Sequence, residues 1–291
     1  MARKIVITSG KGGVGKTTIC ANLGGTLASL GFRVCLIDVD IGLNNLDVVM
    51  GIEKRVMFDI IDVINGHCRA RQALVQDERI SSLYVMPSAH SYSHANVSGE
   101  SIKKVVEDLD ASFDYIFIDC PAGVEAGFHR AVACAGEAIV VVTPHISSVR
   151  DADKVLSILS GYDLLHKSIV INRIRGDMVL NGEMLEAHEI VKVLKTSLLG
   201  VIPESDDISA LSAVGGLALS GTNGRAFMLL AENLHEGTKK IYDYTMKYRG
   251  FFGGLRRNLK RKVWKWHYLK LEMNGLWMFL LKTKILAHTK R

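Results

Sequence analysis

The sequence lacks the features typical of disulfide-rich, metal-clustered or repeat proteins. Its five cysteines are odd in number and include no Cys-x-x-Cys pair, so they are expected to be buried thiols of a reducing compartment. The histidines show no spacing typical of metal ligands. No internal repeat or low-complexity linker is visible. At 291 residues and 48% hydrophobic content, the chain can instead bury one good-sized core.

Long hydrophobic runs are also missing. The longest, such as Leu276–Leu281, have six residues, far below the roughly 20 that a membrane-spanning helix needs. A predicted strand begins almost at Met1, which leaves no room for a signal or transit peptide. We therefore expect a protein that is made and kept in the cytoplasm or an equivalent space.

Charge is distributed unevenly along the chain. The whole sequence carries a net charge of +6. Residues 247–291 contain 13 Lys and Arg against a single Glu, a net charge of +12, which leaves −6 for the preceding 246 residues. An acidic body with a basic tail indicates a negatively charged partner for the tail, either nucleic acid or anionic lipid.

The clearest positive signal is a glycine-rich loop after the apolar run Lys4–Thr8. Residues 10–17 fit the phosphate-loop pattern of a glycine, four free positions and Gly-Lys-Ser/Thr. Glycines let backbone N–H groups turn towards phosphate oxygens, next to the positive end of the following helix. Lys16 is expected to contact the outer phosphates, and Thr17 to supply a hydroxyl to Mg²⁺. The predicted nucleotide-binding residues of this loop are Gly10, Lys11, Gly12, Gly13, Val14, Gly15, Lys16, Thr17 and Thr18.

Runs rich in valine and isoleucine alternate with helical segments along the rest of the body. Such continuous apolar runs are typical of strands buried on both faces of a parallel sheet. The sequence therefore predicts an α/β protein, a three-layer P-loop fold with a mostly parallel twisted sheet flanked by helices. The expected strands are Lys4–Thr8, Val34–Asp38, Leu83–Pro87, Tyr115–Asp119, Ala138–Thr143, Ser168–Asn172 and Leu199–Ile202.

Carboxylates stand at the carboxyl ends of two of these strands. Asp38 ends the second strand and Asp40 comes two residues later, so alternation along the strand would put both side chains on the same side; Asp119 ends the fourth. Ligands of such sheets bind at this edge, and carboxylates that face a phosphate loop can hold Mg²⁺ through its waters. The predicted reaction is phosphoryl transfer to water, in which positioning and charge neutralisation do most of the work.

Lys11 adds a second ammonium inside the loop, where it cannot easily reach the reaction centre of its own nucleotide. With this lysine, the loop resembles the deviant Walker A (ParA/MinD) superfamily, in which such a lysine is thought to contact the phosphates of a partner across a nucleotide-sandwich dimer. The resemblance runs from Met1 to about Tyr248 and is strongest to the septum-site-determining members. It rests on Ser9–Thr18, Asp38–Asp47, Asp119–Glu125, Ser147–Asp153, Asn172-Arg173 and Pro203-Glu204.

The resemblance implies an ATP hydrolase that forms a homodimer in the ATP state, with ATP and Mg²⁺ as cofactors. Lys11 would act in trans, and Asp40 would position the attacking water. The helix that opens at residues 148–153 would help to form a surface for partner proteins. The implied catalytic residues are Lys11, Lys16 and Asp40. The implied metal ligands are Thr17, Asp38 and Asp119. The implied adenine contacts are Asn172, Arg173, Pro203 and Glu204.

The basic tail contains an amphipathic segment. At about 100° per residue its apolar side chains, from Phe252 to Trp266, fall within an arc of roughly 80°, and basic side chains face away. This predicts a helix over residues 248–266 that lies among the headgroups of an anionic membrane. The predicted membrane-contacting residues are Phe251, Phe252, Leu255, Arg256, Leu259, Lys260, Val263 and Trp266. Residues 1–247 would then be the ATPase domain, and residues 267–291 a basic, aromatic extension of unknown role.

The resemblance, taken with the basic tail, implies an ATP-dependent switch that recruits a division inhibitor to position the division septum, with a topological regulator as a further partner. It would lie in the cytoplasm and on the cytoplasmic face of the inner membrane, or in the stroma and on the inner envelope of a plastid that encodes it. Two alternatives stay open, a related ATPase that places flagella or pili and a partition ATPase that binds DNA. The acidic body argues against direct binding of nucleic acid. Tyr242, Tyr244 and Tyr248, a cluster of the kind seen in bacterial tyrosine kinases, are expected to be packing residues at the end of a helix.

Overall fold

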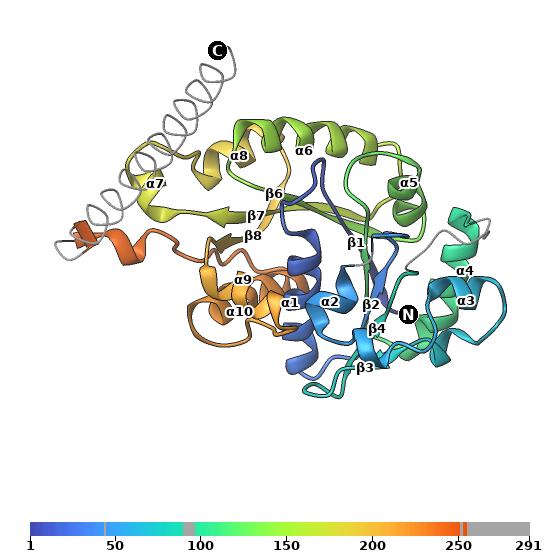
Figure 1. Cartoon of the computed structure of the whole chain (residues 1–291). Coiled ribbons are helices and arrows are strands. Elements are labelled where there is room, and N and C mark those ends of the chain that lie inside the picture. Colours follow the sequence, from blue (N-terminus) through green and yellow to red (C-terminus); the bar gives the residue numbers. More distant parts are fainter. Residues whose placement is uncertain (44, 90–96, 251–252, 255–291) are drawn as a thin grey trace, which may run out of the picture.

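The computed structural model describes residues 1–43, 45–89, 97–250 and 253–254. These residues form one eight-stranded sheet in the order β3-β4-β2-β5-β1-β6-β7-β8 (Figure 1). All neighbouring strands are parallel except the pair of β3 and β4. The strands are β1 (Arg3–Thr8), β2 (Val34–Asp38), β3 (Val75–Gln76), β4 (Leu83–Met86), β5 (Tyr115–Asp119), β6 (Glu137–Val142), β7 (His166–Ile174) and β8 (Ser197–Pro203).

The seven predicted strands are all present, with ends that differ from the prediction by at most two residues. The sequence missed β3, an antiparallel edge strand of two residues that is too short to give a periodic pattern. Asn172 and Arg173 lie inside β7, whereas the sequence ended this strand at Asn172. The strand continues because its pairing with β8 resumes at Ile174 after an irregularity.

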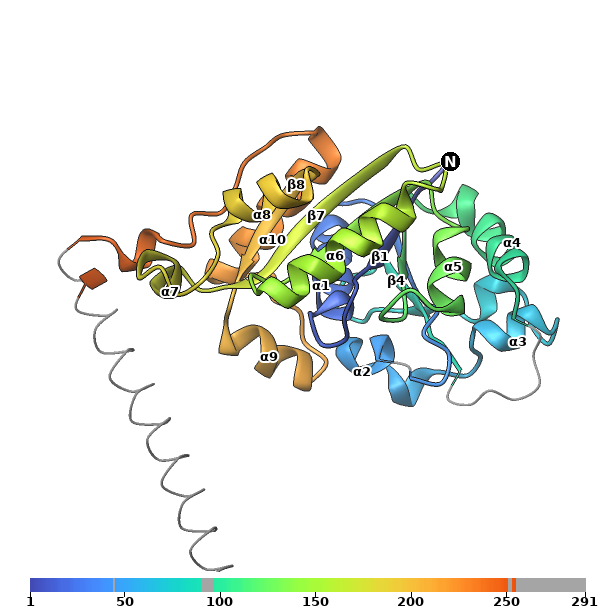
Figure 2. The ribbon, with the colours of Figure 1, turned by 90° about the horizontal axis from the view of Figure 1, so that it is seen from above.

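Helices cover both faces of the sheet, which confirms the three-layer architecture (Figures 1 and 2). One face packs in a core cluster that contains buried residues of α3 (Ile60–Ile64), α4 (Gly99–Leu109), α5 (Ala126–Val132), α6 (Ile146–Leu159), α7 (Gly176–Leu180) and α8 (Ala187–Leu194). The other face packs in a cluster that contains buried residues of α1 (Lys16–Ser29), α2 (Leu46–Met50), α9 (Asp206–Ala213) and α10 (Gly221–Glu236). The strands between are buried on both faces, as their β-branched composition predicts.

The carboxyl ends of the parallel strands meet at one edge of the sheet, where the chain can build a ligand site. The order of the strands places β1 between β5 and β6, so the loop after β1 lies at the centre of this edge. The chain leaves β1 on one side through α1, and it reaches β5 and β6 through helices on the opposite face. This is the position at which ligands bind in doubly wound sheets.

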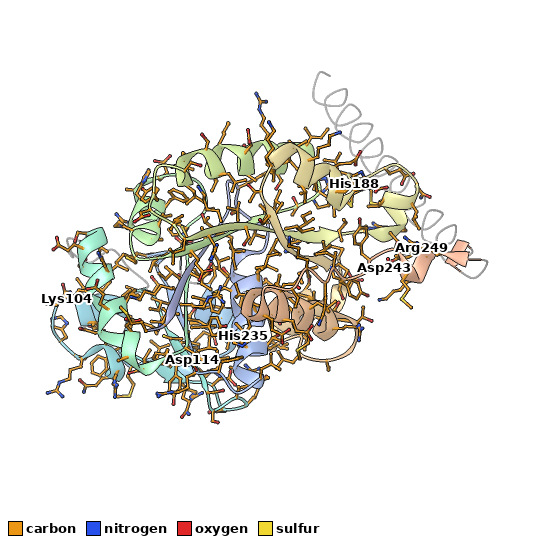
Figure 3. The ribbon with its side chains drawn as sticks, turned by 180° about the vertical axis from the view of Figure 1, so that it is seen from behind. Lys104, Asp114, His188, His235, Asp243 and Arg249 are labelled. Carbon is orange, nitrogen blue, oxygen red and sulfur yellow. The ribbon has the colours of Figure 1, made fainter. Side chains whose placement is uncertain are left out.

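The segment after α10 passes from one face of the sheet to the other (Figures 1 and 2). Tyr242 packs against the core cluster of α1 and α10, and Tyr244 packs against the cluster of α6 and α8. An ion pair of 3.8 Å joins Asp243 to Arg249 near the end of the segment (Figure 3). Tyr242 and Tyr244 are packing residues as expected, but they follow α10 rather than end it, because that helix stops at Gly237 in a left-handed conformation. Tyr248 ends a short 3₁₀ helix, Met246–Tyr248.

The predicted membrane-contacting residues, from Phe251 to Trp266, lie outside the described residues. The same holds for the extension of residues 267–291. Within the part of the chain that the structure describes, no helix is both long and apolar enough to cross a bilayer.

Candidate functional site

The phosphate loop has the geometry that its sequence predicts. Gly13 and Gly15 have φ values of 76° and 95°, a left-handed conformation that glycine adopts without steric cost. The turn at Gly15 lets α1 begin at Lys16, so the free N–H groups of the helix start face the loop. Lys16 and Thr17 are half-buried, whereas Lys11 is exposed. Among the described residues, the side chain of Lys11 makes neither a hydrogen bond nor an ion pair.

The first residue of the loop lies directly against α6. A Cβ added to Gly10 would lie 2.4 Å from the carbonyl oxygen of Asp151, closer than real Cβ atoms come. A Cβ on Gly12 would meet nothing nearer than 3.9 Å. Glycine is therefore required at position 10 for packing and at positions 13 and 15 for conformation.

Asp38 organises the chain segment that follows β2. One carboxylate oxygen accepts a hydrogen bond from the N–H of Asp40 at 2.9 Å, and the other accepts from Asn45 and Leu46 at 3.2 Å each. The last two N–H groups belong to the start of α2, so the carboxylate satisfies donors that the helix leaves unpaired. Burial and the neighbouring charge of Asp119 raise the pKa of Asp38, and these hydrogen bonds oppose the rise.

Asp119 is the carboxylate with a free acceptor. Its side chain is buried, and its Oδ1 has no hydrogen-bond partner among the described residues. Burial raises the pKa of Asp119, while the hydroxyl of Thr17 and the charge of Lys16 lower it. A buried oxygen without a donor, beside a threonine hydroxyl and a lysine, suits a site for a hydrated cation. Thr17 and Asp119 thus fit Mg²⁺, and Asp38 fits it less directly because its oxygens already accept backbone hydrogen bonds.

Asp40 does not lie on the strand, so the expectation that strand alternation aligns it with Asp38 was wrong. β2 ends at Asp38, and the chain turns because the carboxylate of Asp38 binds the N–H of Asp40. Asp40 nevertheless faces the same site. Burial raises its pKa, and the charge of Lys16 lowers it. Asp40 is half-buried, which leaves it accessible to water.

A pocket of about 240 Å³ opens beside the amino end of α1. It brings together all four implied adenine contacts, two from β7 and two from the end of β8 and the residue after it, next to Gly15 and Thr18 of the loop. The sequence missed the rest of the lining because these residues form no motif and reach the pocket only through packing of α9 and α10. They are Ser205, Ile208, Ser209, Ser212 and Phe227.

Asn172 is closer to the phosphate loop than the sequence suggested. Its Nδ2 donates a hydrogen bond of 2.8 Å to the carbonyl oxygen of Val14. Arg173, the next residue, is exposed and has a φ of 60°, which is uncommon for a residue other than glycine. These two implied adenine contacts therefore differ in environment: Asn172 is hydrogen-bonded to the loop, and Arg173 is exposed to solvent.

Known proteins that are similar to this chain bind nucleotides. A family model described as the CobQ/CobB/MinD/ParA nucleotide binding domain matches residues 5–217. The chain is 50% identical over 217 residues to the septum site-determining protein MinD of Bacillus subtilis (strain 168), which covers 74% of this chain and 81% of that protein. The chain belongs to the MinD family of septum site-determining ATPases. The resemblance that the motifs indicated is thereby confirmed.

Two solved structures extend the match to the MinD fold. The MinC:MinD cell division protein complex of Aquifex aeolicus has a TM-score of 0.76 and 41% identity, over 82% of this chain and 97% of that one. The septum site-determining protein MinD of Pyrococcus horikoshii, solved with Mg-ADP, has a TM-score of 0.73 and 31% identity, over 81% and 97%. As a MinD-family member the chain is a P-loop ATP hydrolase with ATP and Mg²⁺ as cofactors. No observation favours the flagellar, pilus or DNA-partition alternatives.

Proposed function

We propose that this MinD-family ATPase is a dimerising switch that binds a membrane in its ATP state and recruits a MinC-like division inhibitor. A MinE-like or other topological regulator would control its hydrolysis. The observation that carries the proposal is Lys11, an exposed lysine in a phosphate loop whose other lysine, Lys16, already lies beside the site carboxylates. A second ammonium at this position fits the phosphates of a second copy better than its own.

Each residue of the site would have a separate role in the reaction. The N–H groups of the loop and Lys16 would bind the phosphates, and Thr17 with Asp119 would hold Mg²⁺, whose charge would stabilise the transferring phosphoryl group. Asp40, half-buried and beside Lys16, would orient the attacking water. Lys11 of the partner copy would complete the site, so hydrolysis would depend on dimerisation.

The location follows from the basic tail and stays a proposal. A tail of net charge +12 with an apolar stripe suits the surface of an anionic membrane, where each basic side chain contributes about 1 kcal/mol. Two tails in one dimer would bind more firmly than one, because the second binds at a high effective concentration. We place the protein in the cytoplasm and on the cytoplasmic face of the inner membrane, or at the equivalent surface of a plastid. The MinC-like partner is supported by the Aquifex complex, which contains MinC bound to a structural relative of this chain.

The test is sedimentation of the purified protein with anionic liposomes in Mg-ATP and in Mg-ADP. A truncation that ends at Tyr248 and a duplex-DNA binding assay serve as controls. The proposal predicts sedimentation in ATP only, lost on truncation, and no binding of DNA. Binding of DNA in ATP without binding of liposomes would instead support a partition ATPase.

A further inference from the structure

One side chain connects the pocket beside α1 to the backbone of the phosphate loop. Asn172 is 6% exposed and comes from β7, while Val14 lies between β1 and α1, and the two are 158 positions apart in the sequence. The hydrogen bond from Nδ2 to the carbonyl oxygen of Val14 therefore crosses from one part of the sheet edge to another. Asn172 also lines the pocket, so one residue touches both halves of the site.

The backbone of β7 departs from regular geometry at this position. The register of β7 against β8 is irregular between Ile171 and Ile174, and Arg173 adopts a left-handed conformation. Such a conformation is unfavourable for a residue with a Cβ and persists only where the surrounding structure holds it. Here it accompanies the burial of Asn172 against the loop, with the side chain of Arg173 turned to solvent.

The loop is shaped to receive this amide group. A Cβ added to Gly15 would lie 2.4 Å from Nδ2 of Asn172, so the amide occupies the space that a side chain at position 15 would need. The absence of a side chain at Gly15 thus serves both its left-handed φ of 95° and its contact with Asn172. The fit is specific to a short side chain that carries a donor.

We propose that Asn172 is a positioning residue for the phosphate loop, which it holds through the Val14 carbonyl in the orientation that binds phosphate. The inference rests on the nucleotide site of the proposed switch and deepens it. It differs from a role in reading the base, because the acceptor of the Asn172 donor is a backbone carbonyl of the loop itself. Loss of the donor should therefore loosen the loop of the nucleotide-free protein as well as weaken nucleotide binding.

The experiment measures amide hydrogen exchange over residues 12–17 of the nucleotide-free protein, together with the affinity for Mg-ATP. The variants are Asn172→Ala and the isosteric Asn172→Asp, which removes the donor and points an oxygen at the Val14 carbonyl. The matched control is Ser209→Ala, which alters the pocket lining away from the loop. Far-ultraviolet circular dichroism checks that each variant is folded.

Both Asn172 variants should exchange faster over the loop and bind ATP more weakly, each by about tenfold, the factor that corresponds to roughly 1.4 kcal/mol for one buried hydrogen bond. Ser209→Ala should leave loop exchange unchanged. Weaker binding of ATP with unchanged loop exchange would make Asn172 a base contact and overturn the inference, as would no change in either quantity. A wild-type protein without ATP hydrolysis would refute the proposed function alone, since the exchange comparison needs no nucleotide.

Discussion

Gly10 of the phosphate loop and Asp151 of α6 are in backbone contact, with no space between them for a Cβ. α6 also carries residues 148–153, which the family resemblance implies as part of a surface for partner proteins. Since packed elements do not deform independently, the loop cannot change its conformation at Gly10 without displacing the first turns of α6.

Gly10→Ala should therefore destabilise the nucleotide-free protein and abolish ATP binding. Its Cβ would overlap the backbone of Asp151, a form of overpacking that costs about 2 kcal/mol or more. Gly12→Ala is the matched control, because a Cβ there has 3.9 Å of clearance and the φ of Gly12 is not positive. Thermal unfolding without nucleotide measures the difference. Equal melting temperatures for the two variants would mean that the contact does not hold the loop.

Asp119→Asn should make the protein more stable at alkaline pH while abolishing Mg²⁺-dependent hydrolysis. Burial raises the pKa of Asp119 to about 6 and, with the charge of Asp119, that of Asp38 to about 8. A carboxyl with a raised pKa binds its proton more firmly in the folded state than in the unfolded state. Stability therefore falls as pH rises from about 4 to about 8.

The amide in Asp119→Asn does not titrate, and it also removes the repulsion between two carboxylates. At pH 8 the free energy of unfolding should therefore rise by about 1 kcal/mol. Melting temperatures across pH 4.5 to 8.5, measured in a chelator without nucleotide, give the comparison. The variant should show a shallower decline than the wild-type protein. Parallel curves would show that the pair does not titrate as its burial indicates.

Gly176→Ala should release the segment of residues 238–248 from α7. A Cβ on Gly176 would lie 2.0 Å from the carbonyl oxygen of Tyr244, so the segment or the helix must move, at a cost of about 2 kcal/mol. The expected result is faster hydrogen exchange in this segment. Gly136→Ala is the control, since its Cβ would meet nothing nearer than 4.0 Å. Unchanged hydrogen exchange at Tyr244 in the Gly176 variant would show that residues 238–248 do not pack tightly against α7.

Much of the fold could be predicted because its signals are local. Most strands are apolar runs rich in valine and isoleucine, and the loop of Gly10–Thr17 has a fixed spacing. The strand β3 could not be predicted, because two residues with one exposed side chain give no period. The continuation of β7 past Asn172 was also hidden, since it depends on a left-handed Arg173 that only tertiary contacts stabilise.

The site shows the same division between local and tertiary information. Asp38 and Asp119 were found because each ends a strand, and Asp40 because it comes two residues after one; the structure gathers all three at one edge. Their different environments could not be read from the sequence: the carboxylate of Asp38 is occupied by backbone donors, whereas Asp119 has an oxygen without a partner. Long-range contacts also decide the bond from Asn172 to Val14.

Mixing two inactive variants tests whether Lys11 completes the active site of a partner copy. Lys11→Ala lacks the lysine, and Asp40→Ala lacks the implied water-positioning carboxylate. In a mixed dimer, one site would combine Asp40 of the first variant with Lys11 of the second. If Lys11 acts in trans, an equimolar mixture should recover about a quarter of the wild-type ATP hydrolysis rate, since half of the dimers are mixed and each has one complete site. No recovery, from variants that still bind ATP and form mixed dimers, would contradict it, because Lys11 would then act only within its own protomer.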